Sequence, residues 1–231
     1  MNNTLLHPRL FLLMLGLLTL GGCSLFGPQN VPEVSTYTLA VQRVHSHSPS
    51  THKTTLLVNT PTATAGYDSR KMIFTNKPYE LGQFARSQWT APPGEMLEPM
   101  LIQKLRDTGY FHAVVSNAYT TNRQLMLRTH LIELRQDFTV KPSQLRLAIQ
   151  AELVNSDDNK VINSQTFTIA MPAYENTPYS GVVAANKAVD RLLTQIAQFS
   201  LKSLQGTQHA TTKTKIKYRF HKKKQVSKIV N

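Results

Sequence analysis

The chain has almost no cysteine: Cys23 is the only one among 231 residues. A single cysteine cannot close a disulfide within the chain, so the fold must rest on an ordinary hydrophobic core. Long apolar runs are scarce as well. The run Leu10–Leu20 has about half of the roughly 20 apolar residues that a membrane-spanning helix needs. Its length is typical of the apolar part of a signal peptide.

The residues after this run account for the position of the cysteine. The segment Leu20–Cys23 ends in Gly21, Gly22 and Cys23, and it resembles the bacterial lipobox. The resemblance implies cleavage after Gly22 and acylation of Cys23, with palmitate among the chains attached. Buried acyl chains contribute about 0.8 kcal/mol per CH₂ to membrane binding. An ordinary secretory signal with an unmodified cysteine is the alternative.

The lipobox resemblance also implies a location. A lipoprotein of this kind lies in the cell envelope of a diderm bacterium, on the side away from the cytoplasm. Ser24, directly after the cysteine, implies sorting to the outer membrane, with the chain anchored in the inner leaflet and facing the periplasm.

Acidic residues are few: 13 Asp and Glu stand against 26 Lys and Arg, for a formal net charge of +13. Residues 207–231 carry +8 of this charge and no acid, whereas residues 23–206 carry only +4. The distribution argues against a nucleic-acid-binding domain. The basic tail is predicted to be disordered. It is either a solvated extension or a segment that binds an anionic surface through its charge.

Composition divides the chain into four parts. We expect a signal peptide over 1–22, a lipidated tether over 23–34, a folded domain over 35–205 and the basic tail over 206–231. The domain has about 170 residues, which is enough for one hydrophobic core.

Alternation of apolar and polar residues predicts most of the strands. The apolar phase of segment 124–138 switches near Leu131 and Ile132, so we expect a β-bulge or a strong twist there. The pattern leaves the state of 79–89 open. The other predicted strands are 37–41, 56–58, 72–74, 113–116, 143–154 and 161–169.

Two amphipathic helices complete the pattern. Leu97, Leu101 and Leu105 recur at i+4 spacing before Gly109, a natural helix stop. A second apolar stripe runs through 180–203. The order of elements predicts an α+β fold, with a mixed or mostly antiparallel sheet and two amphipathic helices packed on one face.

The sequence shows no motif for catalysis, metal binding or a cofactor. It has no phosphate-binding loop and no nucleophile motif. His45, His47 and His52 lie in a Ser- and Pro-rich loop without a carboxylate, so we expect a solvated loop. Asp157 and Asp158 suit a hairpin turn. We therefore expect a protein that is not an enzyme.

Four aromatic residues lie in one region: Tyr67, Tyr79, Phe84 and Trp89. If they are exposed, they form a contact surface for a partner protein. If they are buried, they fill the space between helix and sheet. The run Gly66–Arg70 is interpreted as a turn that pins two elements together, with a catalytic role as the alternative.

Two blocks, residues 66–111 and 178–193, resemble the ABC-type transport auxiliary lipoprotein family, which includes the paraquat-inducible protein C lipoproteins. The first block holds the Gly-Tyr-Asp-Ser run and a Pro-rich helix start; the second contains Asn186. The resemblance covers roughly 35–205. Gly82 and the basic tail depart from the family pattern.

The resemblance implies a role beside an ABC transporter permease and ATPase and a substrate-binding protein of the mammalian-cell-entry type. Such systems are thought to move lipids across the envelope. The chain would act by docking to these partners, and a homo-oligomer is left open. The alternatives are a tether whose tail binds anionic surfaces, or an envelope enzyme whose site the sequence does not reveal.

Overall fold

The computed structural model describes residues 33–40, 52–116 and 124–229, with side chains described as far as residue 205. The predicted signal peptide, Gly22, Cys23, Ser24, His45 and His47 lie outside the described residues. The folded domain belongs to the compact unit that begins at Val34.

The sheet is organised around β7 (Leu125–Asp137), which has neighbours on both sides along its length. On one side it pairs antiparallel with β8 (Gln144–Asn155) from end to end. On the other side three short parallel strands pair with it in succession: β2 (Thr55–Val58), β3 (Thr62–Ala63) and β4 (Lys71–Thr75).

The remaining strands extend this arrangement outward. β9 (Val161–Pro172) pairs antiparallel with β8, and β5 (Gly82–Trp89) pairs antiparallel with β4. β1 (Ser35–Tyr37) lies parallel to β5, and β6 (Ala113–Val115) lies parallel to β2. The described sheet therefore has nine strands and is mixed, as predicted. The undecided segment 79–89 supplies β5.

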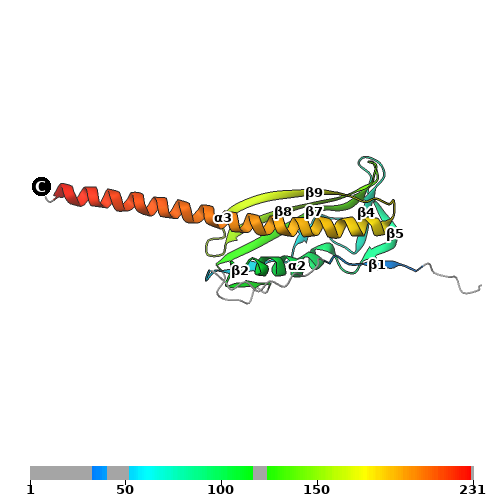
Figure 1. The fold of residues 1–231 in the computed structure, drawn as a ribbon, viewed down its shortest axis with the longest axis horizontal. Coiled ribbons are helices and arrows are strands. Elements are labelled where there is room, and N and C mark those ends of the chain that lie inside the picture. The colour runs from blue at the N-terminus through cyan, green and yellow to red at the C-terminus, as the bar shows by residue number, and fades with distance from the viewer. Residues whose placement is uncertain (1–32, 41–51, 117–123, 230–231) are drawn as a thin grey trace, which may run out of the picture. The chain divides into compact units, whose positions relative to one another are not determined.

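Two helices pack against the sheet: α2 (Pro93–Asp107) and α3 (Pro178–Ile229). They also contact each other, which places them together on the sheet (Figure 1). Gly109 has a φ of +63°, a left-handed conformation that suits glycine and ends α2. The predicted α+β fold is confirmed.

The two faces of β7 differ because side chains alternate along a strand. Leu127, Leu131 and Leu134 are buried in the core that both helices cover. The register shifts between Leu131 and Glu133, which is the predicted bulge. The bulge keeps Leu134 in the core after the phase switch, and it directs Glu133 and Arg135 to the other face.

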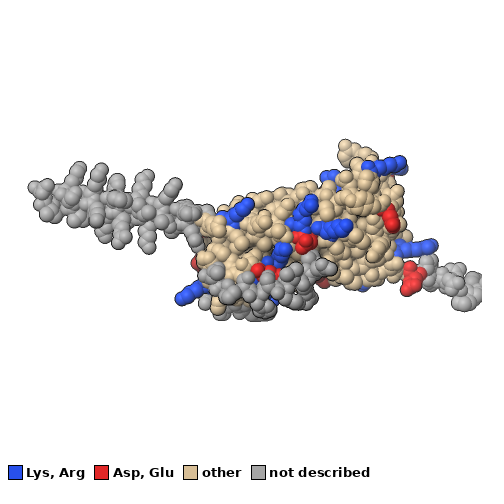
Figure 2. All heavy atoms as spheres, in the orientation of Figure 1, with Lys and Arg blue, Asp and Glu red and all other residues tan. Residues whose placement is uncertain are grey.

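The C-terminal helix extends further than predicted. α3 continues to Ile229, through the described part of the segment 206–231 for which the sequence predicts disorder (Figure 1). After Gly206 this segment contains neither Gly nor Pro to end a helix. Its lysines near the C-terminus also interact favourably with the helix dipole, which stabilises the helix. On the face seen in Figure 2, the basic side chains of the described residues lie scattered among acidic and uncharged ones.

The predicted aromatic contact surface is corrected by the structure at two of its four residues. Trp89 and Tyr67 are buried, with 3% and 7% of their surface exposed. Trp89 ends β5, where its backbone N–H donates to Arg70 O at 2.8 Å and its carbonyl accepts from Arg70 Nε at 3.0 Å. Arg70 thus fixes both backbone groups of the strand end, and the indole ring packs into the core.

Trp89→Ala is expected to lower the free energy of unfolding by about 3–5 kcal/mol, because it leaves a large cavity. Tyr174→Ala, at an exposed aromatic residue, is the matched control and should change it by less than about 0.5 kcal/mol. Thermal unfolding followed by circular dichroism measures both. A Trp89→Ala protein as stable as the parent would show that the ring is not part of the core.

Candidate functional site

The run Gly66–Arg70 forms a turn that connects β3 to β4. Gly66 has a φ of +97°, and its N–H donates to Asp68 Oδ1 at 3.2 Å. Arg70 then bonds to both backbone groups of Trp89. These side chains are used to hold the turn against the end of β5. The predicted structural role of the run is confirmed.

Asn186 in the second family block has a similar role on α3. Its Oδ1 accepts from Ala40 N at 2.6 Å, and its Nδ2 donates to Thr38 O at 3.4 Å. The side-chain amide thus pairs with the backbone that follows β1. It ties this segment to the helix in the way that a neighbouring strand would.

Three connections of the chain lie at one end of the sheet: 76–81 between β4 and β5, 138–143 between β7 and β8, and 173–177 between β9 and α3. Phe138 N donates to Thr75 O at 2.9 Å, and Ala173 N donates to Ser143 O at 2.7 Å. Hydrogen bonds thus join β7 to β4 and β8 to β9 at the place where the connections begin. We call the surface of these connections, with the first turn of α3, the loop end.

The loop end carries a group of exposed apolar side chains. Tyr79 is fully exposed, and 78% of Tyr174 and 60% of Tyr179 are exposed. Leu81 and Val140 are also exposed. These five are among the nine large hydrophobic residues that are exposed in the described part of the chain. Exposed apolar residues gathered in one region are typical of an interaction surface.

Prolines accompany these exposed residues in the sequence. Pro78 precedes Tyr79, Pro142 follows Val140 by two residues, and Pro178 precedes Tyr179. Proline fixes its own φ and restricts the residue before it. The connections therefore lose less conformational entropy when a partner orders them, which favours binding.

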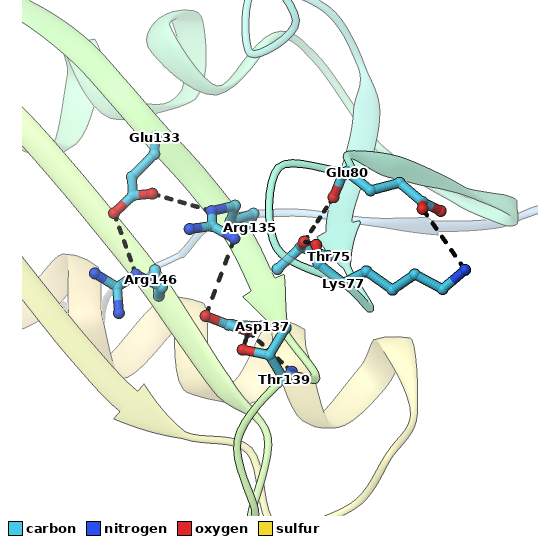
Figure 3. A network of polar contacts seen from close by, with 8 residues as sticks. All are labelled: Thr75, Lys77, Glu80, Glu133, Arg135, Asp137, Thr139 and Arg146. Atoms are coloured by element: carbon cyan, nitrogen blue, oxygen red, sulfur yellow. Dashed lines mark hydrogen bonds and ion pairs between the residues drawn. The ribbon is translucent and has the colours of Figure 1, made fainter.

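A network of charged side chains lies on the outer face of β7 and β8 beside the loop end (Figure 3). Arg135 and Arg146 stand directly opposite each other on the two strands. Glu133 lies between them, 3.0 Å from Arg135 Nε and 3.5 Å from Arg146 Nε. Like charges directly opposite each other on neighbouring strands repel. The Glu133 carboxylate compensates this repulsion between the two guanidinium groups.

Asp137 extends this network to the connection 138–143. Its Oδ1 accepts from Thr139 N at 3.0 Å and from the Thr139 hydroxyl at 2.5 Å, and Arg135 lies 4.0 Å from Oδ2 (Figure 3). Burial would raise the pKa of Asp137, but the bonds from Thr139 and the attraction of Arg135 and Arg146 outweigh it and lower the pKa. The ionised carboxylate therefore holds the start of this connection.

Thr75 organises the neighbouring connection 76–81. It is buried, and its Oγ1 lies 2.8 Å from Lys77 O and 2.6 Å from Glu80 O (Figure 3). We call these two hydrogen bonds the Thr75 bracket. Between the two carbonyl groups that it holds, Tyr79 has a φ of +67°, which is uncommon for a residue with a side chain. Strained residues of this kind persist where the surroundings hold them, and they gather at functional sites.

The four aromatic residues predicted for partner contact therefore separate. Tyr79 lies at the loop end, whereas Tyr67 and Trp89 lie in the core. Phe84 is half-buried, with its ring 4.7 Å from that of Phe74 and 6.3 Å from that of Phe138. Sequence reasoning missed the other exposed residues of the loop end: Leu81, Val140, Tyr174 and Tyr179. The available signal was an apolar residue close to proline in each short connection.

The described residues show no arrangement that suits metal binding: no three His, Cys, Asp or Glu side chains in that part of the chain are grouped to hold an ion. The His52 ring packs against Tyr110 with centroids 4.0 Å apart. Asp157 and Asp158 form the predicted turn, where Asp157 N donates to Asn155 Oδ1 and Asp158 pairs with Lys160. Within the same described part, no helix is long and apolar enough to span a bilayer.

Asp137→Asn is expected to lower the free energy of unfolding by about 1–2 kcal/mol at neutral pH, because hydrogen bonds to a charged group contribute about 1.5–3 kcal/mol and the amide keeps part of this. The pKa of Asp137 is lowered on folding, so its contribution is complete above the ordinary value of about 3.9 and is lost as the pH falls through the folded value.

Urea denaturation at pH 7, 5 and 3 measures this effect. The parent and Asp137→Asn should differ equally at pH 7 and 5 and less at pH 3. Asp158→Asn, in the exposed turn, is the control and should show a much smaller difference. A difference between the parent and Asp137→Asn that grows at pH 3 would contradict the role given to the ionised carboxylate.

Comparison with solved structures shows the fold. The protein XCC0632 from Xanthomonas campestris, described as a DUF330 family protein, has a TM-score of 0.68 at 22% identity, over 76% of this chain and 99% of that one. Another uncharacterized protein has a TM-score of 0.59 at 11% identity, over 72% of this chain and 97% of that one. No curated protein matches the sequence.

Comparison with protein families agrees with the two sequence blocks. A family profile described as the ABC-type transport auxiliary lipoprotein component matches residues 37–197. The match includes the turn at Gly66–Arg70, all of α2, and the first part of α3 with Asn186. It spans well over half of the sequence, and the chain therefore belongs to the ABC-type transport auxiliary lipoprotein family.

Proposed function

We propose that this chain is a lipid-anchored accessory subunit of an ABC transport system, and that it docks to its protein partners through the loop end. The gathering of exposed Tyr79, Leu81, Val140, Tyr174 and Tyr179 on three short connections and the first turn of α3 carries this proposal. Tyrosine is enriched in protein interfaces because it combines a large apolar ring with a polar hydroxyl.

The polar contacts that hold the connections also support a binding role for the loop end. The Glu133–Arg135–Asp137 network and the Thr75 bracket fix two of the three connections by side-chain hydrogen bonds and ion pairs. A surface held in its binding conformation pays less ordering entropy when a partner arrives.

The chemistry of the loop end also favours docking over catalysis. Its five large exposed side chains are apolar or phenolic. Its exposed charged residues are Lys77, Glu80, Lys141 and Glu175, of which Lys77 and Glu80 pair with each other. The charged groups of the network beside it are also paired with one another. An active site needs a nucleophile, an acid or a base free to reach a substrate. The paired carboxylates of Glu133 and Asp137 serve the β7–β8 ladder and its turn.

Family membership supports a proposal for the partners and the cargo. We infer that the chain acts beside a permease and ATPase complex and a substrate-binding protein of the mammalian-cell-entry type, in the transport of lipids between the two membranes. The acylated Cys23 would hold the domain in the outer membrane, facing the periplasm. Ten residues separate it from Val34. Such a segment reaches at most about 40 Å, which raises the local concentration of the domain near the membrane.

The double variant Tyr79→Ser/Tyr174→Ser tests the docking surface. It should reduce recovery of the transporter and the substrate-binding protein with the tagged lipoprotein by at least tenfold, as loss of aromatic anchors does at interfaces. Val161→Ser is the matched control, because Val161 is exposed at the start of β9, at the other end of the sheet. Its recovery should equal that of the parent.

Vesicle flotation of the same proteins separates docking from direct membrane contact. Equal recovery of partners with the double variant would contradict the proposal. Partner recovery that is unchanged while vesicle binding falls would assign the loop end to the lipid surface instead. Because both tyrosines are exposed, thermal unfolding should be unchanged in every variant.

Cys23→Ala tests the anchor. The variant should remain unprocessed or become soluble, and it should incorporate no labelled palmitate, because the proposed acylation needs the thiol. Ser24→Ala keeps the lipobox and should remain lipid-labelled. A Cys23→Ala protein that is fully membrane-associated and labelled would contradict the anchor.

A further inference from the structure

β9 forms one border of the described sheet: it pairs with β8 and with no other strand in that part of the chain (Figure 1). Ala173 N donates to Ser143 O, so the backbone of the odd-numbered residues turns toward β8. In an antiparallel ladder the residues between them turn the other way. The backbone groups of Ser164, Thr166, Thr168 and Ala170 therefore face outward.

This edge lacks the usual protection against pairing. Natural edge strands carry charges, prolines or bulges that prevent another strand from adding. Residues 161–171 contain no charged residue and no proline, and the register with β8 is unbroken from Asn163 to Pro172. One outward N–H is occupied, because Ser164 N donates to Asn163 Oδ1 at 2.9 Å. The edge is thus open from Thr166 to Ala170.

A groove of about 340 Å³ runs beside this open edge, between β9 and the flank of α3. Thr166, Phe167 and Thr168 line it from the strand, and Gln195 and Gln198 line it from the helix. Lys202 contributes the single charge of the lining. The helix therefore leaves the strand edge accessible and presents mostly uncharged side chains next to it.

We propose that β9 pairs antiparallel with β9 of a second copy of this chain, about a twofold axis at Phe167. In this register Thr166 lies opposite Thr168 of the second copy. Ser164, whose N–H is bonded to Asn163 Oδ1, lies opposite Ala170 at the two ends of the new ladder. All the outward-facing residues then meet outward-facing residues, as an antiparallel ladder requires. The uncharged strand brings no like charges together, and cross-strand threonine pairs are favourable.

The position of α3 fits this pairing. The helix packs on both β8 and β9, so its axis lies over the gap between them. Strands are about 4.8 Å apart, so the two copies of α3 would lie about 10 Å apart across the axis. Helices pack at about 8–10 Å. The grooves of the two copies then merge, and Gln195 and Gln198 can bond with their counterparts across the axis.

Cysteine crosslinking of the full-length protein in the cell envelope tests the pairing. One tagged copy carries Thr166→Cys and a differently tagged copy carries Thr168→Cys. Opposed residues of a hydrogen-bonded pair have Cα atoms about 5.5 Å apart, which suits a disulfide. We expect a disulfide dimer that contains both tags. Copies with Arg128→Cys, on the exposed outer side of β7, control for random collision and should give at least tenfold less.

Three results would overturn the proposal: no dimer with both tags, an equal yield from Arg128→Cys, or a disulfide from Thr168→Cys to a protein of another mass. Thr168→Pro removes an outward N–H without breaking the β8 ladder, and Thr168→Lys places a charge at the edge. Each should reduce co-purification of two tagged copies at least tenfold, while Thr168→Ser should not. Full co-purification of Thr168→Lys would also overturn it.

Discussion

The pairing of β7 on both sides is the interaction on which the rest of this structure depends. β8 covers one edge of β7 from Leu125 to Asp137, and β2, β3 and β4 occupy successive parts of the other edge. Segments that are far apart in the sequence are thereby held at fixed register positions along one strand. The loop end exists because β4, β7 and β9 reach the same level before their connections begin.

The bulge after Leu131 lets β7 serve both the core and the outer face of the sheet. It restores Leu134 to the core under the helices, and it directs Glu133, Arg135 and Asp137 to the outer face near the loop end. Without this shift, charged and apolar side chains would exchange faces in the last part of the strand. The same residues that order the outer face also hold the connection to β8 through Thr139.

Local patterns predicted the elements well, because helix and strand periodicity are properties of neighbouring residues. The leucine spacing of α2, the alternation of β8 and the phase switch at Leu131 all correspond to what is observed. Whether Trp89 and Tyr79 are buried or exposed could not be predicted in this way. It depends on which side of β5 faces the helices and on how the connection before β5 is held, and both follow from long-range register.

The tail and the loop end show the same limit. Composition predicted a disordered segment after residue 205, whereas α3 continues through it without a residue that ends a helix. Tyr79 stands about 100 residues before Tyr174 and Tyr179 in the sequence. The three reach the same end of the sheet only after β4, β7, β8 and β9 have paired. Their shared feature in the sequence is proximity to proline, a signal too common to identify a surface without the fold.

Site-specific photocrosslinking in the envelope tests the central claim that the loop end contacts partner proteins. A photoreactive phenylalanine at Tyr79 should crosslink to the transporter or the substrate-binding protein. The same probe at Asp157, in the exposed turn at the other end of the sheet, should not. Crosslinks from residue 157 with none from residue 79 would contradict the account.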